Sequence, residues 1–113
     1  MPSSLVMDFS AYNQYDGPKA IFVTMNGCPH CIDFKPMVDD ASNRVPIKIF
    51  EADDTFHSEI QRMFPGAIQG YPTLLYVHAD RVSIFDKQRT PQNVADWLAI
   101  EASRPQSYTF LKI

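Results

Sequence analysis

The sequence predicts a single α/β domain in which helices flank a central mixed, mostly parallel β-sheet. Short runs rich in β-branched and aromatic residues alternate along the chain with segments whose apolar residues recur every three or four positions. The last two strand-like runs are separated only by a tight connection, which predicts an antiparallel hairpin at the edge of the sheet. The predicted order of elements is β-α-β-α-β-α-β-β-α.

In the first half of the chain the pattern predicts strands at residues 6–9 and 19–25, a polar helical turn reaching residue 16, and a helix over about residues 29–42. The second strand is a continuous apolar run, which suits a strand buried on both faces. Pro29 fits the first helical turn, where its missing N–H costs nothing. Pro36 lies inside the helix and is expected to kink it.

In the second half the pattern predicts strands at residues 46–52, 73–78 and 82–85, a helix from residues 53–55 to about 63, and a final helix over about residues 90–101. Thr90 followed by Pro91 is typical of a helix N-terminus. We interpret His57 as a solvated residue on a helix surface and His78 as the end of a strand.

The length of 113 residues is that of one domain, with a core over about residues 5–101 and a short tail over residues 102–113. A net charge of −3 and the absence of any basic run argue against nucleic acid and anionic membranes as partners. No run of 18 apolar residues is present, so no membrane span is predicted. Without a recognisable secretory signal, we expect a cytoplasmic location. We also expect a monomer.

The chain has only two cysteines, Cys28 and Cys31, and they are three positions apart. Cys28 falls at the junction of a buried strand and a helix N-terminus, where free N–H groups and the helix dipole stabilise a thiolate. Cys31 lies on the same helix face and can reach the Cys28 sulfur. This arrangement predicts dithiol–disulfide exchange, with Cys28 as nucleophile, Cys31 as resolving cysteine, and no cofactor beyond their own disulfide.

The two residues between the cysteines are expected to tune this chemistry. His30 can be cationic and can donate hydrogen bonds toward Cys28, which stabilises the thiolate and makes the oxidised protein a stronger oxidant. Pro29 pre-sets the helical turn. The alternative for His30 is an ordinary surface histidine.

The Cys28-Pro29-His30-Cys31 motif, with Pro36 five residues after it and the segment Gly70-Tyr71-Pro72-Thr73 further along, resembles the thioredoxin superfamily, and especially protein disulfide isomerase-like domains. The resemblance covers roughly residues 5–101 and implies a thioredoxin fold. It also implies that Pro72 is preceded by a cis peptide bond and lies beside the cysteines. Tyr71 would then present backbone hydrogen bonds to a substrate strand.

The segment from Phe85 to Thr90 resembles the last hairpin and loop of the disulfide isomerases. There an arginine approaches the buried resolving cysteine, and Arg89 occupies the matching place. A cation there would lower the pKa of Cys31. A solvated Arg89 is the alternative.

Two positions depart from this resemblance. Gly27 stands where most relatives carry a tryptophan before the first cysteine, and Phe22 stands where they bury an acid that accepts a proton from the second. Loss of Cys31's proton would then need water or another group. Residues 79–81 replace the glycine-rich glutathione site of glutaredoxins, which argues against glutathione binding.

The favoured hypothesis is an enzyme that exchanges disulfides with protein or peptide substrates, in an oxidase or isomerase direction, and is recycled by a reductase or a thiol oxidase. The alternative is a non-catalytic adaptor or redox-sensing binding module of the same fold. The third hypothesis is metal binding by Cys28, Cys31 and a histidine. These ligands would leave a tetrahedral site incomplete. We therefore predict no metal.

Overall fold

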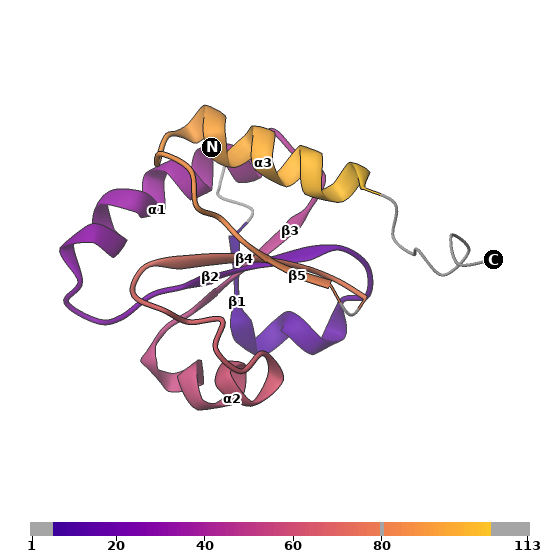
Figure 1. Cartoon of the computed structure of the whole chain (residues 1–113). Coiled ribbons are helices and arrows are strands. Elements are labelled where there is room, and N and C mark those ends of the chain that lie inside the picture. Colours follow the sequence, from indigo (N-terminus) through magenta and orange to yellow (C-terminus); the bar gives the residue numbers. More distant parts are fainter. Residues whose placement is uncertain (1–5, 80, 105–113) are drawn as a thin grey trace.

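A five-stranded mixed β-sheet forms the centre of the computed structural model, and helices cover both of its faces (Figure 1). The structure describes residues 6–79 and 81–104; residues 1–5, 80 and 105–113, which include most of the expected tail, lie outside the described part. The elements in chain order are β1 (Val6–Asp8), the 3₁₀ helix η1 (Phe9–Gln14), β2 (Lys19–Val23), α1 (Pro29–Ser42), β3 (Lys48–Ala52), the 3₁₀ helix η2 (Asp54–Phe56), α2 (His57–Met63), β4 (Thr73–His78), β5 (Arg81–Ile84) and α3 (Pro91–Ser103).

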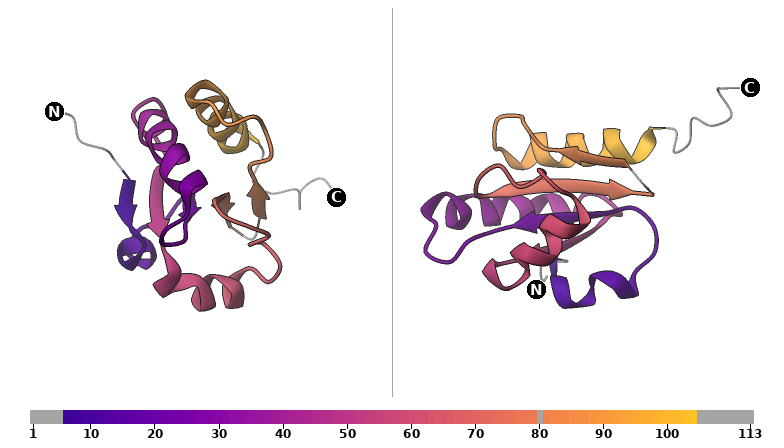
Figure 2. Two further views of the ribbon diagram at one scale, coloured as in Figure 1. Left: turned by 90° about the vertical axis from the view of Figure 1, so that its left-hand side faces the viewer. Right: turned by 60° about the horizontal axis from the view of Figure 1, so that its bottom comes forward.

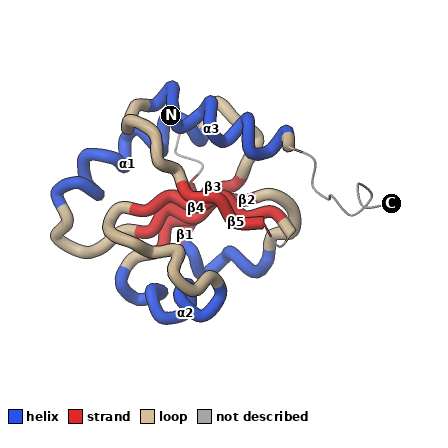
Figure 3. Tube along the Cα trace, in the orientation of Figure 1, coloured by secondary structure: helices blue, strands red, loops and turns tan. Residues whose placement is uncertain are grey.

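The strands lie in the order β1-β3-β2-β4-β5 across the sheet, which Figure 3 shows as a central band between helices. β1 and β2 each pair with β3 in parallel, whereas β4 is antiparallel to both β2 and β5. The expectation of a mostly parallel sheet with an antiparallel hairpin at its edge is therefore corrected, because antiparallel pairing extends into the centre.

The direction of β4 follows from where β3 leaves the sheet. Val23 at the end of β2 pairs with both Ala52, the last residue of β3, and Thr73, the first residue of β4. Between them α2 has seven residues, which span about 10 Å and do not carry the chain back along the sheet. The chain thus enters β4 at the end where it left β3, and a helix between two strands does not here imply a parallel pair.

Helices lie on both faces of the sheet (Figure 2), and an apolar layer holds them on each face. Side chains from α1 and α3, among them Phe34 and Trp97, pack on one face of the sheet with Phe22 and Tyr76. Side chains from η1 and α2 pack on the other face. The loop before α1 and the segments on either side of α2 lie at the same end of the sheet, because Val23 pairs with both Ala52 and Thr73. None of the described helices is long and apolar enough to cross a lipid bilayer.

Two expected elements differ in kind from the prediction. The predicted polar helical turn is a 3₁₀ helix, and it is less polar than expected because it buries Phe9 and Tyr12, whose rings stack with centroids 4.8 Å apart. Its end is held by Lys19, whose Nζ donates to the carbonyl oxygens of Tyr12 at 2.8 Å and Tyr15 at 2.6 Å. The helix expected from residues 53–55 starts as η2 and becomes α-helical only at His57.

Candidate functional site

Cys28 is the N-cap residue of α1, immediately after the loop that ends β2. Its backbone is extended, with φ −89° and ψ 110°, and its Sγ accepts a hydrogen bond from the Cys31 N–H at 3.2 Å. An N-cap normally uses an oxygen to accept from the first helical turn. Here the sulfur accepts instead, and a thiolate accepts more strongly than a thiol because charge strengthens a hydrogen bond. Cys28 is partly exposed, so a substrate can reach it.

Cys31 lies one turn further along α1, and only 5% of its surface is exposed. Both cysteines are free thiols in the structure. Burial, reinforced by the hydrogen bond with Cys28, raises the pKa of the Cys31 thiol to about 11, against opposing contributions from the Met25 backbone and the Arg89 charge. The two thiols therefore differ in environment, with one accessible and one buried behind it.

The Gly70–Thr73 segment lies directly beside Cys28, although it is more than forty residues away in sequence. The Tyr71 carbonyl oxygen is 3.9 Å from Cys28 Sγ, within hydrogen-bonding range for sulfur. The Tyr71–Pro72 peptide bond is cis. The Thr73 hydroxyl donates to the Gly70 carbonyl oxygen at 2.6 Å, which closes the segment into a compact turn.

The expected tuning residues lie at different distances from this centre. Pro29 and His30 occupy the exposed first turn of α1, and among the described residues no hydrogen bond joins His30 to Cys28. Arg89 is exposed, with its guanidinium 5.2 Å from the centroid of the Phe34 ring. Its charge opposes the rise in the pKa of Cys31. α1 continues through Pro36 as one helix, so the kink stays a prediction.

Gly27 and Phe22 have clear structural reasons for their identities. Gly27 has φ +75°, a left-handed conformation that a tryptophan would adopt only with strain. Phe22 is fully buried and meets Phe34 edge to face at 5.8 Å, so apolar packing fills the place of the acid. A cavity of about 220 Å³, lined in part by Cys31, Lys35 and Glu51, offers water a route to the buried thiol.

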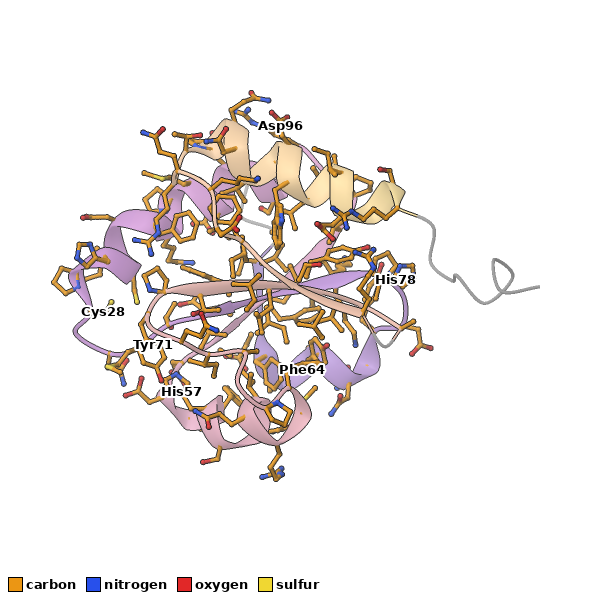
Figure 4. All side chains as sticks on the ribbon, in the orientation of Figure 1. Cys28, His57, Phe64, Tyr71, His78 and Asp96 are labelled. Atoms are coloured by element: carbon orange, nitrogen blue, oxygen red, sulfur yellow. The ribbon has the colours of Figure 1, made fainter. Side chains whose placement is uncertain are left out.

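His57 is the site residue that the sequence interpretation missed. It is half-buried, not a solvated surface residue, and both of its ring nitrogens lie within hydrogen-bonding distance of oxygens of the loops around Cys28. Figure 4 shows Cys28, Tyr71 and His57 on the same side of the molecule. A histidine within the predicted helix carries no signal of such a contact, because its partners come from residues 24 and 71. No group of three or more metal-ligating side chains is found among residues 6–79 and 81–104.

No protein-family profile matches the sequence, and no curated protein matches it. Solved structures do match. The J-Trx1 fragment of ERdj5 superimposes with a TM-score of 0.73 at 15% identity, over 88% of this chain and 53% of that one. The first thioredoxin domain of mouse protein disulfide-isomerase A4 gives 0.69 at 21% identity, over 90% and 76%. A thioredoxin-like protein from Clostridium perfringens gives 0.71 at 14% identity, over 94% and 87%.

This chain spans about half of the ERdj5 fragment that it matches, and all three identities are low. What they share with it is the arrangement of the mixed sheet and its helices, within which this chain carries a pair of cysteines with Cys-x-x-Cys spacing at the start of α1. The chain therefore has the thioredoxin fold, similar to that of thioredoxin-like domains from the protein disulfide isomerase family.

Proposed function

We propose that this protein is a thiol–disulfide oxidoreductase that acts on protein or peptide disulfides. The observation that carries the proposal is the pairing of a partly exposed Cys28, capping α1, with a buried Cys31 whose N–H donates to the Cys28 sulfur at 3.2 Å. One cysteine is placed to attack, and the other is placed to resolve.

In the reductive direction the Cys28 thiolate attacks one sulfur of a substrate disulfide. A mixed disulfide with Cys28 forms, and the other substrate sulfur leaves as a thiolate. Cys31 then loses its proton and attacks the Cys28 sulfur, which forms the Cys28–Cys31 disulfide and releases the second substrate thiolate. Two electrons pass from the cysteine pair to the substrate, and a dithiol partner must return them. In reverse, the pair donates its disulfide to a substrate dithiol and is reoxidised by a thiol oxidase.

The groups around the pair support assigned roles. Arg89 favours the Cys31 thiolate through its charge, and water in the cavity beside Cys31 accepts the proton that the replaced acid would have taken. Tyr71 and Pro72 form the surface on which an extended substrate lies, with the Tyr71 backbone as hydrogen-bonding partner. His30 and Pro29 set the redox properties of the motif.

Reduction of insulin and oxidative refolding of reduced ribonuclease test the proposal in the two directions. Cys28→Ser is expected to abolish both activities, and Cys31→Ser is expected to accumulate a mixed disulfide between Cys28 and the substrate. Cys28→Ser with full activity and unchanged partners would exclude the enzyme.

The second candidate is a non-catalytic adaptor or redox-sensing module. Gly27 and Phe22 favour it, since they remove the aromatic surface and the buried acid of efficient relatives. An adaptor would retain its partner after Cys28→Ser and would show no turnover in either assay.

A further inference from the structure

His57 joins three parts of the molecule at the edge of the candidate site. Its Nε2 lies 2.7 Å from the carbonyl oxygen of Thr24, just after β2, and its Nδ1 lies 3.1 Å from the hydroxyl of Tyr71. The His57 and Tyr71 rings are also nearly parallel, with an angle of 12° and centroids 4.8 Å apart. One side chain at the start of α2 therefore ties the Tyr71 ring to the end of the central strand.

The partners of the ring determine where its proton lies. A carbonyl oxygen only accepts, so Nε2 must carry the hydrogen that it donates to Thr24. In the neutral ring Nδ1 then keeps its lone pair and accepts from the Tyr71 hydroxyl. Both nitrogens are thus used in one tautomer, which holds the imidazole plane and, through stacking, the phenol plane.

Tyr71 carries this constraint to the backbone that lies beside Cys28. Its ring is held by His57, while its carbonyl oxygen lies 3.9 Å from Cys28 Sγ. On the other side of the cis bond the turn is closed by the Thr73 hydroxyl on the Gly70 carbonyl oxygen. Tyr71 also packs against the apolar layer beneath η1 and α2, and the His57 contact adds a polar anchor for its ring.

We propose that His57 is a positioning residue. It fixes the Tyr71 backbone in the position where an extended substrate can pair with it beside Cys28. The inference rests on the proposed function, because it assigns His57 to the substrate surface of that site. His57 touches neither sulfur, so its loss changes how well a substrate is held and leaves the reactivity of Cys28 unchanged. The expected effect is a KM for insulin raised about fivefold to tenfold, as for the loss of one or two net hydrogen bonds.

Two substitutions separate the contacts of the ring. His57→Phe keeps a planar ring for stacking and removes both hydrogen bonds, whereas His57→Gln keeps an N–H near the Nε2 position and removes the ring. Ser58→Ala, at the exposed next residue of α2, is the matched control. We expect a raised KM for both His57 variants, larger for Phe if the hydrogen bonds dominate, with kcat, the Cys28 alkylation rate and the urea midpoint of each soluble variant close to wild type. An unchanged KM, or a fall in Cys28 alkylation, overturns the inference.

Two further measurements do not depend on turnover. The ¹⁵N shifts of the His57 ring in the wild-type protein are expected to report the Nε2–H tautomer, and an Nδ1–H tautomer overturns the inference even if the variants fold poorly.

The second measurement is binding. Carboxymethylated insulin B chain is the binding probe for a Cys28→Ser/Cys31→Ser protein, with and without His57→Phe. Binding that His57→Phe weakens, in a protein whose wild type reduces no insulin, supports the inference while the proposed function fails. Equal insulin KM in wild type and His57→Phe removes the inference alone, and absence of both binding and turnover removes both.

Discussion

Cys31 owes its chemical character to neighbours that lie around it in space. It is nearly enclosed, and its pKa is raised to about 11 by burial and by the hydrogen bond between its thiol and the Cys28 side chain. Cys28, three residues earlier, is partly exposed at the helix end. Two identical side chains, one turn of helix apart, thus have different exposure and different surroundings.

Alkylation of the reduced protein tests this difference. At pH 8 iodoacetamide is expected to modify Cys28 and leave Cys31 intact, with the Cys31 rate rising about tenfold per pH unit toward pH 11, because only the thiolate reacts. Mass spectrometry of digested protein measures both sites, and the chain unfolded in urea is the control. Equal modification of both cysteines at pH 8 contradicts the raised pKa.

The same pKa has a consequence for stability. Between about pH 9 and pH 11 the folded chain keeps the Cys31 proton while the unfolded chain releases it. The folded state then binds more protons, so the contribution of this group to the free energy of unfolding is full below pH 9 and falls as the pH rises through that window. Urea titrations of reduced wild type and Cys31→Ser at pH 8 and pH 10.5 should show a larger loss in the wild type.

His30 sets a second expectation at the residue scale. It lies exposed on the first turn of α1, where a protonated imidazole would add to the positive end of the helix dipole. The Cys28–Cys31 pair is therefore expected to have a reduction potential more oxidising than the roughly −270 mV of thioredoxin. Equilibration with glutathione measures it, and His30→Ala should move it to a more negative value. A wild-type potential at or below that of thioredoxin contradicts the role of His30.

The start of a helix depends directly on the local sequence, because the residue before the first turn caps it. Thr90 caps α3 through its Oγ1, which accepts from the Asn93 N–H at 3.0 Å, and Pro91 follows at the first helical position. Cys28 occupies the equivalent place in α1, with a sulfur in place of the hydroxyl oxygen. Both caps have an extended backbone, and each side chain accepts from the N–H three residues further along.

Thr90→Ala is expected to lower the free energy of unfolding by about 1 kcal/mol, because the Asn93 N–H loses its acceptor. Thr90→Ser keeps the hydroxyl and should remain within a few tenths of a kcal/mol of wild type. Urea denaturation followed by the fluorescence of Trp97, the single tryptophan of the chain, provides the measurement. Equal stability of the Ala and Ser variants would show that this cap contributes nothing.

At the scale of the whole molecule, a buried ion pair links α3 to β5, the edge strand of the sheet. Glu101, 4% exposed on α3, accepts from Arg81 on β5 and from the Ser83 hydroxyl at 2.8 Å. Arg81 also donates to the Glu101 carbonyl oxygen at 2.9 Å. These contacts hold α3 to the edge strand, on the side of the sheet away from the β1 edge.

Arg81→Met leaves the buried Glu101 carboxylate with only its longer ion pair to the more exposed Arg104, at 3.7 Å, and is expected to cost about 3 kcal/mol. The double variant Arg81→Met/Glu101→Leu removes both charges and should recover most of that loss. Lys35→Met, which breaks the more exposed pairs with Asp39 and Glu51, is the control and should cost at most about 1 kcal/mol. Denaturation by urea gives all three values, and a double variant as unstable as Arg81→Met contradicts this account.

The sequence by itself determined the order of strands and helices, the placing of Cys28 at a helix start, and Cys31 one turn behind it. These features depend on periodicity, proline position and short spacing, which are properties of neighbouring residues. The resemblance to thioredoxin-like domains added an expectation for Tyr71 and Pro72 that local pattern does not contain.

Only the tertiary structure decided the direction of β4, the raised pKa of Cys31 and the contacts of His57. The direction of β4 depends on where a short α2 returns the chain, and the pKa depends on what encloses the sulfur. His57 reads as an ordinary polar residue on a helix, yet its ring lies between the Thr24 carbonyl and Tyr71. Burial and hydrogen bonding between distant segments are fixed by packing, because each requires groups that the fold alone brings together.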